Sequence, residues 1–288
     1  MTILLLVLAH LIADFYLQTE TMVSDKKKYL LRHLVHHTIT IFLALTVLYF
    51  VQGTEFLTQV LLPTLVIVTL HGVVDGIKIK LQEKSVTTQR QNSYNLSLFV
   101  GDQLLHIISI LVVCYLFIKV DLGDIFHYIL LSLKLIEGVQ PDHGLVNSLL
   151  FLCIMFILCT SVTGHLIKIM LGTLTRHLSL FEGKYTLRDL AVSATSEKNM
   201  SEEYTYMVMK HQDLSRGKVI GYLERLLVVA LILMGSFSAV GFIVAAKSLT
   251  RFKQMDDRDW AEYFLLGTLT SFLLAIVYGV VLKVVLLG

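Results

Sequence analysis

Residues 2–19 read TILLLVLAHLIADFYLQT, an apolar segment that carries one histidine and one aspartate four positions apart. Residues i and i+4 of an α-helix lie on the same face, one turn apart. If the segment is helical, His10 and Asp14 therefore project in the same direction from an otherwise apolar helix. The same arrangement occurs three more times within the first 106 residues.

The other three pairs also lie in or beside apolar segments. They are His33 and His37 in RHLVHH (32–37), His71 and Asp75 in LHGVVDGIK (70–78), and Asp102 and His106 in GDQLLH (101–106). Neutral imidazole and carboxylate are ligand types that divalent metals bind in proteins. The pattern predicts four helices, each of which presents two metal ligands from one face.

The composition is typical of a membrane protein. Of the 288 residues, 55% are hydrophobic and 16% are charged, and mean hydropathy is +0.73. Apolar stretches of about 20 residues, the length that crosses a bilayer, recur along the chain. Because backbone polar groups must be satisfied inside lipid, we predict an all-α, polytopic membrane protein with about seven transmembrane helices. The net charge of +2, without a basic and aromatic patch, argues against a nucleic-acid partner.

The N-terminal part, residues 1–120, is predicted to form a four-helix bundle that bears the His/Asp pairs. Its spans are expected at 2–19, 33–51, 56–77 and about 96–118. The loops at 25–32 and 78–90 are basic, and basic loops lie in the cytoplasm. This orientation places the N-terminus outside and all four pairs toward the cytoplasmic side.

The remainder of the chain divides into three regions. Residues 121–174 hold a short apolar stretch at 125–137 and a fifth span at 145–174. Residues 175–218 form a polar region, expected in the cytoplasm. Residues 219–288 are predicted to form a transmembrane hairpin with spans at 219–246 and 261–286. An odd number of crossings in this half would put the basic turn between those spans outside, against the charge rule.

The ligand count favours two metal ions over one. A single catalytic zinc ion usually takes three protein ligands and a water molecule, whereas the four pairs offer eight groups. Two neighbouring ions are used to hydrolyse phosphoesters and amides. We expect zinc first, with manganese or iron as alternatives. His36 could replace His37 as a ligand.

Three polar residues beside the pairs are the predicted catalytic residues: Gln18, Lys78 and Gln103. They could orient the ligands or bind a substrate phosphate. The pairs are also compatible with three roles that need no metal centre. A single intramembrane histidine more often bonds a neighbouring helix than a metal. Chains of Asp and His also conduct protons or ions, and a His–Asp pair can be a salt bridge without chemistry.

The segments HLIADFYLQ, HLVHH, HGVVDGIK and DQLLH resemble a bacterial integral-membrane family of unknown function, whose members carry an H-x-x-x-D-F-x-x-Q opening. The resemblance covers roughly residues 1–115, and GYLERLL at 221–227 looks like part of its longer members. More distantly, the His/Asp spacing is similar to that of membrane-bound metal-dependent hydrolases. That likeness implies metal ligands at His10, Asp14, His71, Asp75, Asp102 and His106. Only RHLVHH resembles the histidine boxes of membrane desaturases.

Together, these features favour an enzyme. We expect a membrane-embedded, metal-dependent hydrolase that acts on a lipid-borne or amphipathic phosphoester at the cytoplasmic leaflet of the bacterial cytoplasmic membrane. The alternative is a divalent-cation or proton transporter that uses the same residues, and a purely structural protein is third. The expected partners are the bilayer and a small amphipathic or lipid substrate, and a homo-oligomer is compatible with the sequence.

Overall fold

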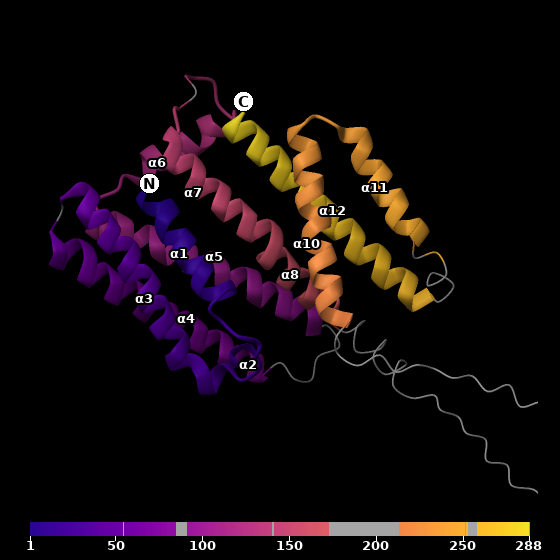
Figure 1. Ribbon diagram of the computed structural model, residues 1–288. Helices are drawn as coiled ribbons and strands as arrows, with labels where there is room; N and C mark the ends of the chain where they lie inside the picture. The colour runs from indigo at the N-terminus through magenta and orange to yellow at the C-terminus, as the bar shows by residue number, and fades with distance from the viewer. Residues whose placement is uncertain are drawn as a thin grey trace, which may run out of the picture.

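The computed structural model describes residues 1–53, 55–84, 91–139, 141–172, 213–250, 252 and 258–287, and its regular elements are all helices (Figure 1). The predicted all-α class is therefore confirmed for these residues. In chain order the helices are α1 (Thr2–Phe15), α2 (Glu20–Ser24), α3 (Lys26–Gln52), η1 (Leu57–Leu61), α4 (Leu62–Lys84), α5 (Gln91–Phe117), α6 (Leu122–Ser132), α7 (Gly144–Ile157), η2 (Leu158–Val162), α8 (Thr163–Met170), α10 (Asp213–Leu233), α11 (Phe237–Thr250) and α12 (Arg258–Leu286).

Five helical segments in the described part of the chain are long and apolar enough to cross a membrane. They are Lys26–Val51, Leu57–Glu83, Asn92–Phe117, Gly144–Met170 and Ala261–Leu286. Two of these contain a π-helical turn, because η1 runs into α4 and η2 joins α7 to α8. By length and composition these five segments are candidate membrane spans, and α1, α6 and α11 are shorter apolar helices.

The first span predicted from the sequence is shorter than expected. Helix α1 ends at Phe15 instead of continuing to residue 19. The hydroxyl of Thr19 then accepts a hydrogen bond from the backbone N–H of Met22 at 3.4 Å, which caps the short helix α2. A threonine at this position satisfies one of the free N–H groups of a new helix, and the chain turns there.

The stretch 25–32, predicted as a loop, is helical instead. The carboxylate of Asp25 accepts a hydrogen bond from the backbone N–H of Lys28 at 3.2 Å, so that α3 begins at Lys26. Its lysines therefore form the first turn of a long helix. We call this end of the helices, which carries Lys26, Lys27, Lys28 and Lys80, the basic end. The ion pair between Lys27 and Glu83, at 3.3 Å, joins the start of α3 to the end of α4 there.

Helices α1, α3, α4 and α5 pack around one another in the left part of Figure 1. Helix α1 contacts α3 and α5, and α4 also contacts both. Away from the basic end, the space between them is filled by an apolar core, made of Leu6, Ala9, Ile41, Ala44, Leu45, Leu48, Val60, Ile67, Ile110, Val113 and Cys114. This core fixes how the four helices face one another.

Helix α7 connects the two halves of the molecule, and Figure 1 shows it between α1 and the C-terminal helices. On one side Leu11 of α1 packs with Ile154 and Ile157 of α7. On the other side α7 and η2 share an apolar core with α10, α11 and α12, which includes Met155, Cys159, Val228, Val229, Ile232, Val240, Phe272, Ala275 and Leu282.

The predicted span 219–246 is wrong as a single helix. Helix α10 ends at Leu233 and α11 begins at Phe237, and the chain reverses at Gly235, whose φ is +74°. The backbone N–H groups of Gly235 and Ser236 bond to the carbonyls of Ile232 and Leu231, an arrangement that ends helices at a glycine. The hairpin returns the chain toward the end where α10 starts (Figure 1).

This reversal removes the conflict with the charge rule. Because α10 and α11 form a hairpin, the end of α11 and the start of α12 lie at the same end of the molecule as α2 (Figure 1). Lys247 and Arg258 are thus at the basic end instead of the opposite one. Of the predicted polar region, residues 173–212 lie outside the described residues, and residues 213–218 form the start of α10.

Candidate metal centre

Each helix of the N-terminal group contributes one of the four pairs to a single cluster. Seven of the eight side chains belong to residues that are buried, and Asp14 keeps 11% of its side-chain surface exposed. The cluster consists of His10 and Asp14 on α1, His33 and His37 on α3, His71 and Asp75 on α4, and Asp102 and His106 on α5. Below we call these eight residues the His/Asp cluster.

The Asp14 carboxylate is surrounded by four imidazoles from three helices. Nε2 of His37 lies 2.8 Å from Oδ1 of Asp14. The Nε2 atoms of His33 and His71 lie 3.3 and 3.9 Å from the same oxygen. Nε2 of His10 lies 3.8 Å from the other oxygen, Oδ2. All four rings therefore turn the same nitrogen toward one carboxylate.

Asp75 and Asp102 extend the cluster toward α5. Oδ2 of Asp75 lies 3.4 Å from Nε2 of His33 and 3.3 Å from Nε2 of His71. Its other oxygen lies 4.0 Å from Nε2 of His106, and that nitrogen lies 3.4 Å from Oδ1 of Asp102. The eight groups thus form one continuous network, not four separate pairs.

Three imidazole rings of the cluster are stacked. The His71 ring lies between those of His37 and His106, with ring centroids 3.7 and 3.9 Å apart. Stacking at this distance suits rings without charge, since two positive charges so close would repel each other. Neutral imidazole is the form that binds metals.

The donor atoms gather in three overlapping groups. Within each group, one ligand atom per residue lies within 4.8 Å of every other. The groups are His10, Asp14, His37 and His71; His33, His71 and Asp75; and Asp75, Asp102 and His106. They share His71 and Asp75, so neighbouring metal positions could use common ligands.

The charge of the cluster fits the binding of cations. Three carboxylates, those of Asp14, Asp75 and Asp102, lie among five imidazoles, and the described residues bring one lysine ammonium, that of Lys78, into contact with them. A carboxylate at the centre of a membrane helix costs about 2.5–3.5 kcal/mol on insertion scales and requires a partner. A divalent ion would supply the missing positive charge.

Several buried polar atoms of the cluster lack a hydrogen bond. Within the described part of the chain, Nε2 of His10, Nε2 of His106 and Oδ1 of Asp102 have no hydrogen-bond partner. Buried polar groups are normally satisfied, and the exceptions mark places where an ion or a ligand can bind. The residues present therefore fit a divalent metal of the kind expected from the sequence.

Lys78 and Gln103, two of the predicted catalytic residues, contact the cluster directly. The ammonium of Lys78 donates a hydrogen bond to Oδ2 of Asp102 and lies 5.7 Å from the ring centroid of Phe99. The side-chain amide of Gln103 donates to Oδ2 of Asp14 at 2.9 Å and to Oδ2 of Asp102 at 3.4 Å. Gln103 thereby connects carboxylates on two helices and fixes their orientation.

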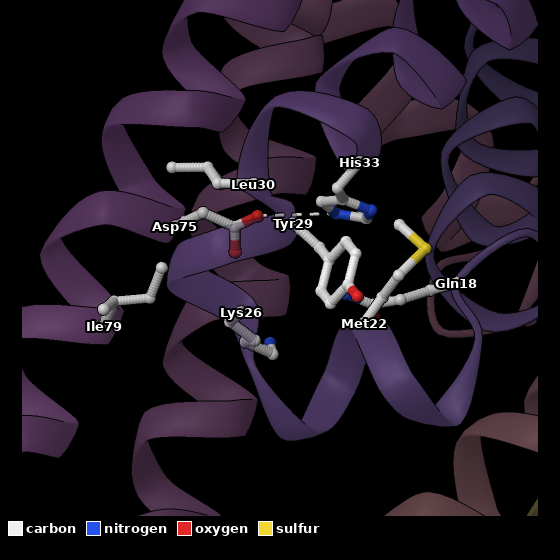
Figure 2. Close-up of a pocket in the computed structure, with 8 residues that line it drawn as sticks. All are labelled: Gln18, Met22, Lys26, Tyr29, Leu30, His33, Asp75 and Ile79. Carbon is white, nitrogen blue, oxygen red and sulfur yellow. Dashed lines mark ion pairs between the residues drawn. The ribbon is translucent and has the colours of Figure 1, made fainter.

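Gln18, the third predicted catalytic residue, lines a pocket that leads to the cluster (Figure 2). The pocket lies at the basic end, between the turn after α1, helix α2, the start of α3 and the end of α4. Its lining consists of Gln18, Met22, Lys26, Tyr29, Leu30, His33, Asp75 and Ile79. Two members of the cluster, His33 and Asp75, are reached from it.

The sequence did not single out Lys26 and Tyr29 as site residues. With α3 beginning at Lys26, the positions 26, 29 and 33 have helical spacing and share a face. A loop at residues 25–32 would not have this periodicity, so the loop interpretation concealed the signal. His37, and not His36, joins the cluster.

Two adjacent charged residues of α10, Glu224 and Arg225, contact different partners. Glu224 pairs with Lys247 of α11. Arg225 is buried and donates instead to the backbone carbonyls of Cys159 and Thr160 in η2 and to the hydroxyl of Ser271. This guanidinium holds α10 against the π-helical turn and α12.

One family model, which has no assigned activity, matches the N-terminal part of the chain. Residues 2–133, which include the whole His/Asp cluster, match the model of a family described as "Protein of unknown function (DUF3307)". No curated protein and no solved structure matches the chain.

Proposed function

We propose that this protein is a membrane-embedded, metal-dependent hydrolase that cleaves a lipid-borne or amphipathic phosphoester at the cytoplasmic leaflet. The observation that carries the proposal is the gathering of eight imidazole and carboxylate groups from four apolar helices into one network, with three overlapping sets of donor atoms. Burial of so many ionisable groups in membrane helices is costly and is typical of a functional site.

The overlap of the three donor sets supports a pair of neighbouring divalent ions. Nitrogen and carboxylate oxygen donors suit zinc, and also manganese or iron. When bound, such ions polarise a phosphoryl oxygen and activate water. Hydrolysis adds one water molecule across the P–O ester bond and releases an alcohol and a phosphate.

The remaining polar residues have supporting roles in this proposal. Gln103 holds the carboxylates of Asp14 and Asp102 in place through its amide group. Lys78 neutralises Asp102 and would face the negative charge that develops on the substrate. The H-x-x-x-D-F-x-x-Q pattern fits the same picture, since it includes His10 and Asp14 of the cluster and Gln18 of the pocket.

Transport by the same residues is less well supported. A transporter requires polar groups that continue to the opposite side of the membrane. Beyond the His/Asp cluster, away from the basic end, the described helices are closed by the apolar core that includes Leu45, Val60 and Val113. The pocket, by contrast, opens at the basic end. Access from one side suits an enzyme more than a conducting pathway.

Orientation and location are part of the proposal. The basic end would face the cytoplasm, following the charge rule, in a bacterial cytoplasmic membrane. Helix α1 would complete the N-terminal group from within the bilayer, and the α10–α11 hairpin would enter from the cytoplasmic side. In this proposal the α10–α11 hairpin replaces the single transmembrane helix that the sequence predicts at 219–246. A homo-oligomer is compatible with the many apolar residues exposed on the helices.

The test begins with metal analysis of the purified full-length protein. We expect about two zinc, manganese or iron ions per chain, and their loss in His71→Gln and Asp75→Asn, since both residues belong to two donor sets. His127→Gln, an exposed histidine on α6, is the matched control and should keep the metal. Release of alcohol and phosphate from a panel of amphipathic phosphoesters is then compared among these variants.

Three results would overturn the proposal. Absence of bound metal after loading with zinc, manganese and iron would remove the centre itself. Metal binding that is equal in all variants would place the ions elsewhere. Uptake of metal or protons into vesicles, without hydrolysis of any phosphoester, would favour the transporter.

A further inference from the structure

Helix α4 carries a lysine on the same face as its two members of the His/Asp cluster. His71, Asp75 and Lys78 follow one another at intervals of four and three positions, which is the spacing of one helix face. Lys78 is only 8% exposed, and lysine is rarely buried so deeply unless it is paired. The fold therefore brings a buried cation into a group of metal-ligand side chains.

Two residues of α5 hold the ammonium of Lys78. Its Nζ atom donates a hydrogen bond to Oδ2 of Asp102, and this carboxylate is buried as well. The same Nζ atom lies 5.7 Å from the ring centroid of Phe99, a distance at which an aromatic face attracts a cation. Phe99 is buried and packs edge-on against the ring of Phe15. The ammonium is therefore fixed at one place beside Asp102.

This contact distinguishes one of the three donor groups from the other two. The group of Asp75, Asp102 and His106 includes the carboxylate that Lys78 contacts. In the other two groups, the ion pairs among the described residues join aspartates to histidines. Below we call Asp75, Asp102 and His106 the third donor group.

The third donor group has enough ligands for a metal ion of its own. Oδ1 of Asp102 lies 3.4 Å from Nε2 of His106, and neither atom has a hydrogen-bond partner among the described residues. Oδ1 of Asp75 lies 4.0 Å from the same nitrogen. Two carboxylate oxygens and one imidazole nitrogen make three protein ligands, the number that a zinc ion with a bound water usually takes.

The ammonium and a metal ion would compete for the carboxylate of Asp102. A divalent ion bound to Oδ1 would lie close to the ammonium that Oδ2 of the same carboxylate already accepts. A double and a single positive charge repel each other twice as strongly as two single charges at the same distance, and buried charges are screened less than charges in water. The ammonium also supplies the positive charge that a buried carboxylate requires. Lys78 therefore disfavours a metal ion in the third donor group.

From these features we infer that the ammonium of Lys78 takes the place of a third metal ion, so that the His/Asp cluster holds two ions and not three. The inference rests on the proposed function, because it concerns the metal content of the same site. The two ions belong to the other two donor groups. The third donor group is a latent metal site, which binds a divalent ion when the ammonium is removed.

The test counts zinc ions per chain in the full-length protein in detergent, after loading with zinc and removal of the free ion. Lys78→Met removes the ammonium and keeps a side chain of similar length, so zinc content should rise from about two to about three ions per chain. Lys80→Met changes an exposed lysine of the same helix and should leave the content unchanged. The double variant of Lys78→Met with Asp102→Asn removes the carboxylate as well, and its content should return to that of the wild type.

Three results would overturn the inference. Zinc content that is equal in the wild type and Lys78→Met would mean that the ammonium excludes no ion, and a lower content in Lys78→Met would mean that Lys78 supports the bound ions. A gain that persists in the double variant would place the additional ion away from Asp102. If Lys78→Met does not fold because Asp102 is left unpaired, the double variant still decides, since loss of an ion from it would make Asp102 a ligand in the wild type.

The same measurements separate this inference from the proposed function. A wild type with two zinc ions and no gain in Lys78→Met would retain the metal centre and reject only the role of Lys78. A third ion in Lys78→Met, together with a metal-loaded wild type that hydrolyses no phosphoester, would retain the latent site and reject the hydrolase. A wild type that binds no metal would reject both.

Discussion

The Nε2 atoms of His33 and His71 lie 3.1 Å apart, although the two residues belong to different helices. Each of these nitrogens also contacts both Asp14 and Asp75: the distances are 3.3 and 3.4 Å for His33, and 3.9 and 3.3 Å for His71. Only one of the two nitrogens can carry the proton of a hydrogen bond between them. A shared cation would satisfy both nitrogens and both carboxylates at once.

The first prediction concerns the coupling of these two histidines. If both bind the same ion, His33→Gln and His71→Gln will each lower zinc affinity strongly, and the double variant will lose clearly less than the sum of the two free-energy changes. Residues that share a partner are not additive in double-mutant cycles, and the interaction energy is about 0.5–3 kcal/mol. Competition with a chelator measures the four affinities, and additive losses would argue against a shared ion.

The second prediction concerns Gln103, which donates to Asp14 and Asp102 but is not itself a metal ligand. Gln103→Leu removes both hydrogen bonds while it keeps the ligands, so we expect zinc affinity to fall about 10- to 100-fold, as for other groups that orient ligands. Ser97→Ala, exposed on the same helix, is the control and should leave the affinity unchanged. An unchanged affinity in Gln103→Leu would mean that the two carboxylates do not need this support.

The third prediction concerns metal removal. A ligand that binds only the folded state stabilises it by about 2.7 kcal/mol when its concentration is one hundred times Kd. Zinc should therefore raise Tm of the protein in detergent, and a chelator should lower it. In Asp75→Asn, which alters a carboxylate shared by two donor sets, Tm should no longer respond to zinc. A zinc effect of equal size in this variant would place the stabilising ion away from the cluster.

The sequence allowed the helical class and the candidate ligands to be predicted because both depend on short-range spacing. A pair four residues apart, such as His71 and Asp75, shares a helix face whatever the rest of the fold does. Apolar length is likewise a local property, and five of the predicted spans, at 33–51, 56–77, about 96–118, 145–174 and 261–286, coincide with helical segments long enough to cross a membrane. That the eight residues should converge was a geometric expectation, which spacing alone cannot establish.

Local capping and long-range contacts account for what the sequence did not reveal. Asp25 caps α3 and turns a supposed loop into a helix, which aligns Lys26 and Tyr29 with His33. Gly235 adopts a positive φ and splits a supposed span into a hairpin. Asp25 and Gly235 are single residues, and the sequence around them gives no further sign of the helix start or of the chain reversal. The contact of Lys78 with Asp102 joins two helices, so that no spacing within either helix could have predicted it.

The last prediction concerns the close approach of α10 and α12. A Cβ atom added at Gly279 would lie 2.8 Å from Cβ of Ile232 and 3.0 Å from its Cγ2, and Ile232 is almost fully buried. Since these atoms belong to a branched side chain close to its backbone, α10 and α12 must move apart to accept the methyl group. We expect Gly279→Ala to destabilise the protein by about 1–3 kcal/mol, the range for overpacking a core.

Gly241 on α11 is the matched control, since an added Cβ there meets nothing within 4 Å. Gly241→Ala should be neutral or stabilise the helix by up to about 1 kcal/mol, because alanine favours the helix over glycine. Thermal or denaturant unfolding in detergent measures both, and equal stability of the two variants would mean that α10 and α12 are not in close contact at this position.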